Sequence, residues 1–161
     1  MTIGKTRKKI RSLIASLGLP RHYDIDTLVR NVEAAIGHAI EIRERDDVGN
    51  ATATGGLRKE GNRWVILLDR HCSPRTRVMT ILHELGHLIC GHERVFIRQA
   101  EAAGVLDEFV QCDRATLHSH MGWRYGGPQT EEEVEAEVAA DELSQGLIDP
   151  TADPLRKWLG L

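Results

Sequence analysis

Apolar positions in the first part of the chain recur at the three- and four-residue spacing of an amphipathic helix. The pattern predicts one helix over residues 5–17 and a second over residues 25–36. Asp24 or Asp26 can cap the second helix, and Gly37 can end it. The first helix also carries a basic face, made of Lys5, Lys8, Lys9 and Arg11. A basic face of this kind can meet solvent, a protein partner or a phosphate backbone.

The pattern then changes to short runs that are typical of strands. Strands are predicted over residues 39–43, 51–58 and 63–68, and the last has a continuous apolar core. Residues 60–62, Glu-Gly-Asn, can join the second and third strands as a hairpin. The middle of the chain is therefore expected to form a small three-stranded sheet, antiparallel or mixed.

A long helix is predicted after the sheet. Ser73 and Pro74 supply an N-cap and a first-turn proline, which favour the start of a helix at this point. The apolar pattern continues to about Cys90, where Gly91 can end the helix.

A second long helix is predicted over residues 130–147, with Thr130 as its N-cap and Glu133 in the position of a capping box. The chain between the two long helices has a weak pattern, with one candidate helix around residues 96–103. A short helix is predicted around residues 155–159.

The helix that begins at Ser73 contains the sequence His83-Glu84-Leu85-Gly86-His87. One turn separates the two histidines, so both can reach a single metal ion from the same face. Glu84 lies about 100° further round the helix, where it can take a proton from a water that the metal activates. This spacing is typical of metal-assisted hydrolysis, with His83 and His87 as ligands and Glu84 as general base.

The motif is specific, and its surroundings fit it. A shuffled chain of this composition would contain it roughly 0.03 times. Residues 78–82 and 88–90 on either side carry no charge, as expected for a helix that is buried on its other faces. The alternative is a pair of surface histidines on an ordinary core helix.

A catalytic zinc site usually has a third protein ligand. The metzincin continuation would need Gly at position 90 and His at position 93, where this chain has Cys90 and Glu93. His92 is out of register by one residue. A carboxylate on the last long helix is the other common solution. We expect Glu133 to be that ligand, with Glu137 as an alternative ligand or as a group that orients a histidine.

Two further assignments at this site have simple alternatives. The acidic run over residues 131–137 can serve only to stabilise a helix N-terminus. Four polar residues of the preceding segment are candidate donors to an oxyanion or to substrate, although they can equally be ordinary loop residues: His118, His120, Arg124 and Tyr125.

Composition excludes several functional classes. The chain has 161 residues, which fits one domain, and its net charge of −3 argues against direct nucleic-acid binding. No window approaches the roughly 20 apolar residues of a membrane span, and the first 30 residues lack a signal-peptide pattern, so a cytoplasmic protein is expected. The three cysteines lack the spacing of a disulfide framework or of a cysteine zinc site.

These motifs resemble those of the ImmA/IrrE family of zinc metallopeptidases. The resemblance rests on residues 80–88, Thr-Ile-Leu-His-Glu-Leu-Gly-His-Leu, and on residues 133–140, which are similar to the family's Glu-x-x-Ala-Asn-x-Phe-Ala. It extends over roughly residues 20–147. Glu137 stands where the family has Asn, and Ala139 stands where it has Phe. The resemblance assigns the metal ligands and the base to the residues named above, with one Zn²⁺ per chain.

The expected fold is α+β and zincin-like: a three-stranded sheet packs on the motif helix and on the C-terminal ligand helix, and helices precede the sheet. We expect a single metallopeptidase domain over residues 1–161. It would consist of an N-terminal helical segment, 1–37, a catalytic core, 38–147, and a C-terminal helix, 148–161.

The expected activity is that of a zinc-dependent intracellular endopeptidase. Members of the family cut helix-turn-helix repressors, which implies a regulatory protease with such a polypeptide as substrate. In zincins an edge strand pairs with extended substrate, and residues 51–58 or 63–68 can supply it. The alternatives are a catalytically silent zinc-binding module for protein interaction, and a DNA-associated regulator that uses the basic first helix.

Overall fold

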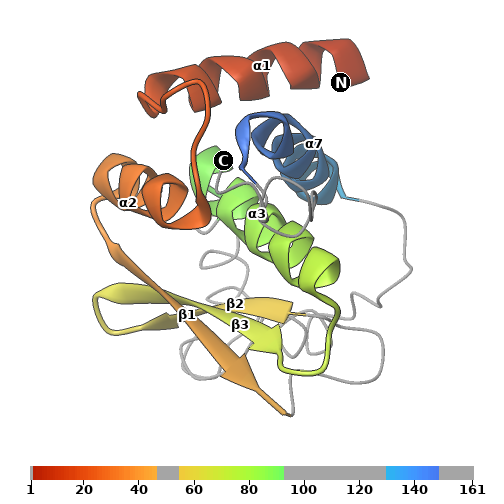
Figure 1. Ribbon diagram of the computed structural model, residues 1–161. Coiled ribbons are helices and arrows are strands. Elements are labelled where there is room, and N and C mark those ends of the chain that lie inside the picture. The colour runs from red at the N-terminus through yellow and green to blue at the C-terminus, as the bar shows by residue number, and fades with distance from the viewer. Residues whose placement is uncertain (1, 47–54, 93–129, 149–161) are drawn as a thin grey trace, which may run out of the picture.

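The computed structural model describes residues 2–46, 55–92 and 130–148, and the α+β class is confirmed (Figure 1). Four helices and three strands form this part of the chain. In chain order they are α1 (Ile3–Ser16), α2 (Ile25–Ile36), β1 (Ala39–Arg45), β2 (Gly55–Glu60), β3 (Arg63–Asp69), α3 (Pro74–Cys90) and α7 (Glu131–Gly146).

Three expected features lie outside the described residues: the helices around residues 96–103 and 155–159, and the first half of the strand 51–58.

The ends of the helices follow from local sequence. The side chain of Asp24, and not that of Asp26, caps α2 by accepting a hydrogen bond from the backbone N–H of Thr27 at 2.7 Å. Gly37 ends α2 in the left-handed conformation, with φ of 74°. No described helix is long and apolar enough to cross a membrane.

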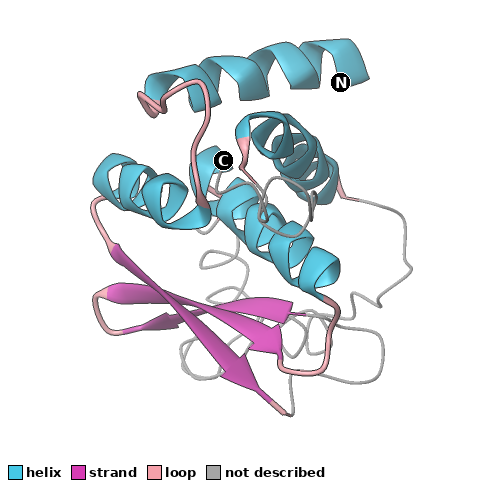
Figure 2. Cartoon of the chain, in the orientation of Figure 1, coloured by secondary structure: helices cyan, strands magenta, loops and turns pink. Residues whose placement is uncertain are grey.

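The sheet is mixed and has the strand order β1-β3-β2 (Figure 2). Strands β2 and β3 form the expected antiparallel hairpin, while β1 pairs with β3 in parallel, so the mixed sheet is the one of the two expected arrangements that the structure confirms. A parallel pair needs a longer connection than a hairpin, and the chain from β1 to β3 runs through β2. Because β3 is paired on both sides, residues 63–68 cannot be an edge strand.

Strand β3 is buried on both faces. Trp64, Ile66 and Leu68 belong to the main core with residues of α2, α3 and α7. Val65 and Leu67 point to the opposite face and form a buried cluster of their own. This double burial explains the continuous apolar run, which differs from the alternation of a half-exposed strand.

Helix α3 lies between the sheet and the other helices (Figure 1). It packs against β2 and β3 on one side and against α7 on the other, and α1 lies across α7. Tyr23 anchors the far end of α7, because its hydroxyl donates to the carbonyl of Leu143 at 2.7 Å and its backbone bridges to Leu147. Helix α7 is therefore held by its packing against α3 and α1, and its C-terminal end is also held by Tyr23.

The basic face of α1 meets α7. Arg7 and Arg11 form ion pairs with Glu142 at 2.9 and 2.8 Å, and Lys9 pairs with Glu135 at 2.5 Å. The carboxylates of Glu142 and Glu135 are nearly buried, whereas the side chains of Arg7, Lys9 and Arg11 remain 38–60% exposed. Lys9 and Arg11 of the basic face therefore stay in contact with solvent but are also paired with α7.

Helices α3 and α7 approach each other most closely at Gly86. A Cβ atom built on Gly86 would lie 2.9 Å from the carbonyl oxygen of Ala136 and 3.0 Å from the Cβ of Ala139. Backbone cannot yield to such a contact without shifting a whole helix. The absence of a side chain at position 86 is therefore a condition of this helix packing.

We predict that Gly86→Ala lowers the free energy of unfolding by about 1–3 kcal/mol, because the added methyl group overpacks the crossing. Gly4→Ala is the matched control: Gly4 also lies in a helix, but a Cβ there meets nothing within 4 Å. The control should keep or slightly raise stability, by up to about 1 kcal/mol. Urea unfolding of the three proteins measures both effects. Equal midpoints for Gly86→Ala and the wild type would contradict the proposed packing constraint.

Candidate metal centre

The His-Glu-Leu-Gly-His motif occupies the last two turns of α3. Ser73 caps the helix as expected, with its hydroxyl accepting from the N–H of Thr76 at 3.1 Å, and Pro74 occupies the first turn. The side chain of His83 is about one quarter exposed, whereas that of His87 is fully buried. The two imidazoles face each other, with their Nε2 atoms 3.1 Å apart.

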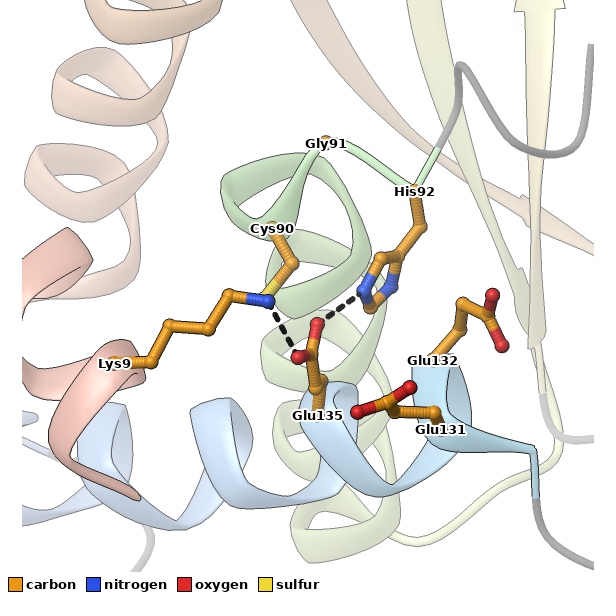
Figure 3. Close-up of a pocket in the computed structure, with 7 residues that line it drawn as sticks. All are labelled: Lys9, Cys90, Gly91, His92, Glu131, Glu132 and Glu135. Atoms are coloured by element: carbon orange, nitrogen blue, oxygen red, sulfur yellow. Dashed lines mark hydrogen bonds and ion pairs between the residues drawn. The ribbon is translucent and has the colours of Figure 1, made fainter. Parts of the chain in front are cut away.

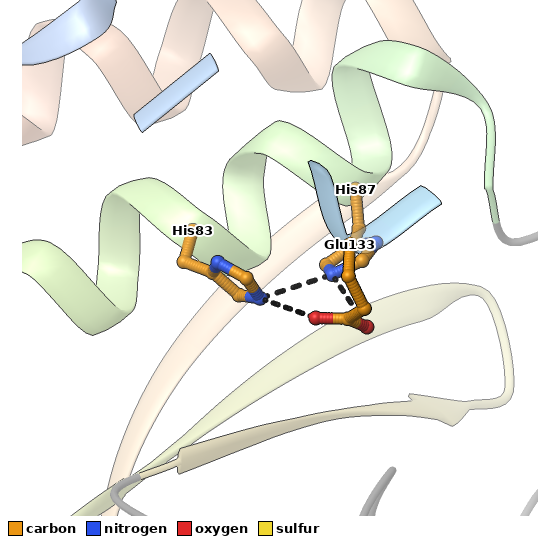
Figure 4. Close-up of side chains that lie close together, drawn as sticks. All are labelled: His83, His87 and Glu133. Carbon is orange, nitrogen blue, oxygen red and sulfur yellow. Dashed lines mark hydrogen bonds and ion pairs between the residues drawn. The ribbon is translucent and has the colours of Figure 1, made fainter. Parts of the chain in front are cut away.

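Glu133 comes to these histidines from the first turn of α7 (Figure 4). Thr130 caps this helix by accepting from the N–H of Glu133 at 3.3 Å, which fixes the backbone that carries the carboxylate. One carboxylate oxygen lies 3.4 Å from His83 Nε2, and the other lies 3.7 Å from His87 Nε2. Two segments far apart in sequence thus bring three potential ligand side chains together.

These distances fit a metal ion. Ligand atoms at about 2.0–2.1 Å from a tetrahedral zinc ion lie about 3.3–3.4 Å from one another. The two Nε2 atoms are 3.1 Å apart, and the nearest Glu133 oxygen to each, a different one in each case, is 3.4 or 3.7 Å away, all close to that value. Two imidazoles and one carboxylate are also a donor set that catalytic zinc sites use. The group of His83, His87 and Glu133 could therefore hold a metal ion.

Glu84 follows the first histidine and is 3% exposed. A carboxylate is rarely removed from water to this degree, and it is usually removed only where other groups hold it. Its position on α3, beside the histidine pair, is the one expected of a general base in this motif.

A second polar cluster lies behind His87. The Nδ1 atom of His87 is 2.9 Å from Nδ1 of His92, and Nε2 of His92 is 2.8 Å from a carboxylate oxygen of Glu135. The other oxygen of Glu135 accepts from Lys9 of α1. A pocket beside this cluster (Figure 3) is lined by Lys9, Cys90, Gly91, His92, Glu131, Glu132 and Glu135. Cys90, His92 and Glu135 form a second group of potential metal ligands.

The end of α3 explains the position of His92. Gly91 adopts the left-handed conformation with φ of 72°, and its N–H donates to the carbonyl of Leu88. The N–H of His92 then donates to the carbonyl of His87 at 3.0 Å. This pair of hydrogen bonds is a Schellman motif, which turns the chain back over the last helical turn. His92 is therefore folded onto His87 by the helix terminus itself.

The charges of the second cluster are set by burial and by hydrogen bonds. Burial lowers the pKa of His92, although the hydrogen bond to Glu135 acts in the opposite direction. Burial acts to raise the pKa of Glu135, but hydrogen bonds from Lys9 and His92 outweigh it and lower that pKa. The hydrogen bond to Glu135 raises the pKa of Lys9. Glu135 and Lys9 are thus an ion pair, and burial favours the neutral form of the adjacent His92.

The structure brings together the three expected ligands but not every expected site residue. Glu137 is exposed and belongs to neither group of potential ligands within the described chain. The four candidate donors of the preceding loop lie outside the described residues: His118, His120, Arg124 and Tyr125.

Sequence reasoning missed the roles of Lys9, His92 and Glu135. The Gly91-His92 pair was the available signal for His92, since a glycine at a helix end predicts a turn back over that end. Glu135 carried a weaker signal. It lies about 200° round α7 from Glu133, and therefore reaches the other side of His87.

Comparison with known proteins gives one match. The model of the Peptidase M78 family, described as the IrrE N-terminal-like domain, matches residues 36–105, which is less than half of the chain. The matched segment includes the whole sheet and α3, but neither α1 nor α7. No curated protein and no solved structure matches the chain significantly. This match over residues 36–105 supports the resemblance to the ImmA/IrrE metallopeptidases that the sequence motifs indicate.

Proposed function

We propose that this chain is a zinc-dependent endopeptidase that binds one Zn²⁺ through His83, His87 and Glu133. The observation that carries the proposal is the convergence of three ligand side chains from α3 and α7, whose nearest ligand atoms lie 3.1–3.7 Å apart in each pair. The match of residues 36–105 to a peptidase family supports peptide-bond hydrolysis as the reaction. The buried Glu84 within the same motif supplies the group that this reaction needs beyond the ligands.

The chemistry divides between the ion and the chain. Zinc, when bound, would polarise the scissile carbonyl and make a water molecule more acidic. Glu84 accepts the proton of the attacking water and later passes it to the leaving amine. A general base of this kind typically contributes about 10²–10⁴ to the rate.

Extended substrate would lie along β2. Within the described residues the edge strands are β1 and β2, and β2 is the one that packs against the motif helix. An extended peptide can add to such an edge through backbone hydrogen bonds, with little dependence on its sequence. A peptide bound in this way would lie next to the strand that packs against the helix carrying the two histidines.

A helix-turn-helix repressor is the substrate class that the ImmA/IrrE resemblance favours. Cleavage of a repressor would make the chain a regulatory protease. Support for this step comes from the resemblance of residues 80–88 and 133–140 alone.

Two other functions, a catalytically silent zinc module and a DNA-associated regulator, make different demands on the structure. A catalytically silent zinc module would share every ligand and would differ only in hydrolysis, so it is tested through Glu84. A DNA-associated regulator would need the basic face of α1. Lys9 and Arg11 of that face are engaged by acidic side chains of α7, which leaves less positive charge for phosphate contacts.

We predict that Glu84→Gln keeps about one zinc per chain and lowers peptide cleavage by at least about 10²-fold, because the amide cannot accept the proton. Metal analysis gives the zinc content. Mass spectrometry of casein and of a panel of helix-turn-helix repressors gives the cleavage products. Identical products and rates for the variant and the wild type would rule out the proposed mechanism. Full zinc content with no cleavage of any substrate by either protein would favour the silent module.

We predict that Glu133→Ala weakens zinc binding by more than about 10²-fold, whereas Glu137→Ala changes it little. Both residues lie on α7, one turn apart, so the second variant controls for any effect on the helix. Competition with a chromophoric chelator measures the two affinities. A larger loss in Glu137→Ala than in Glu133→Ala would reverse the ligand assignment.

A further inference from the structure

Four side chains form a continuous line behind the candidate metal centre. His87 contacts His92 through their Nδ1 atoms at 2.9 Å, and His92 contacts Glu135 through Nε2 at 2.8 Å. Glu135 in turn binds Lys9 at 2.5 Å. His87, His92 and Glu135 are each less than 5% exposed as whole residues, so their contacts have no competition from bulk water.

The acceptor at the buried end decides where the protons lie along this line. The carboxylate of Glu135 can only accept, so Nε2 of His92 carries a proton and donates a hydrogen bond to it. An imidazole with its one proton on Nε2 can accept a hydrogen bond at Nδ1, here from the Nδ1–H of His87. His87 is left with its lone pair on Nε2, the atom that faces His83 and Glu133.

We propose that His92, held by Glu135, is a positioning group that fixes His87 in the tautomer and orientation that present Nε2 to the metal ion. The inference rests on the ligand assignment of the proposed function. Its parts come from three elements: Lys9 from α1, His92 from the turn after α3, and Glu135 from α7. Two of these elements lie outside the segment that the family model matches.

Lys9 supports the line by neutralising Glu135. A carboxylate that is 3% exposed is costly to bury alone, and the ammonium group on its second oxygen compensates for this. A carboxylate behind a ligating histidine is a common way to orient the ring and to raise its basicity. Here His92 lies between the ligating His87 and the carboxylate of Glu135, so the carboxylate acts on His87 through a second imidazole.

The same residues could instead form a second metal site with Cys90. Two contacts argue against this use. Both ring nitrogens of His92 already have partners, and the ammonium of Lys9 lies 2.5 Å from one oxygen of the Glu135 carboxylate, so a cation bound to that carboxylate would face a like charge. The cluster is therefore better suited to keeping a proton on Nδ1 of His87 than to binding a second metal ion.

The experiment compares His92→Phe and Glu135→Gln with Glu142→Gln. The last is a matched control, because Glu142 is also a nearly buried carboxylate of α7 that pairs with basic residues of α1. Long-range ¹H–¹⁵N NMR on the zinc-free proteins identifies the tautomer of His87. Chelator competition gives the affinity for zinc.

We predict that wild type and Glu142→Gln hold His87 with its proton on Nδ1 and bind zinc equally well. His92→Phe and Glu135→Gln should give a mixture of His87 tautomers and a zinc affinity lower by about 10–100-fold. Loss of stability in the control without loss of affinity would show that docking of α1 alone does not produce the effect.

A wild-type tautomer and wild-type affinity in both His92→Phe and Glu135→Gln would overturn the inference. If Glu133→Ala still weakened zinc binding in the same assay, the proposed function would stand without it. Two zinc ions per chain, one of them lost in Cys90→Ser, would also overturn the inference, in favour of a second metal site.

Discussion

Helices α3 and α7 approach each other so closely at Gly86 that a methyl group there would lie 2.9 Å from the carbonyl oxygen of Ala136. That approach brings Glu133 to the two histidines on one side of His87 and brings Glu135 to His92 on the other. Neither carboxylate is near α3 in sequence. The candidate metal centre therefore exists only when α7 is docked, and the packing of two helices becomes a condition for metal binding.

The local features of the sequence predicted the corresponding local structure. Ser73, Pro74 and Gly91 define the ends of α3, and Thr130 caps α7, because capping depends on a few neighbouring residues. The His83 and His87 pair could be assigned to one helix face for the same reason. Glu133 was also foreseen, through the family resemblance and the need for a third ligand, and it does lie beside the histidines.

Features that depend on distant contacts were not predictable in the same way. The parallel pairing of β1 with β3 leaves no local signal, since a parallel pair has no turn of its own. Lys9 read as part of a basic surface and Glu135 as part of an acidic run, yet each is half of an ion pair that joins α1 to α7. Their roles follow from helix packing, which the spacing of charges within one helix cannot reveal.

The most direct test of the account is X-ray absorption spectroscopy of the zinc-loaded protein, which identifies the atoms bound to the ion. Coordination by His83, His87 and Glu133 predicts only nitrogen and oxygen neighbours at about 2.0–2.2 Å, with the signature of two imidazoles. Glu133→Ala should change that spectrum. A sulfur neighbour at about 2.3 Å would contradict the account, because it would place the ion at Cys90 in the second cluster.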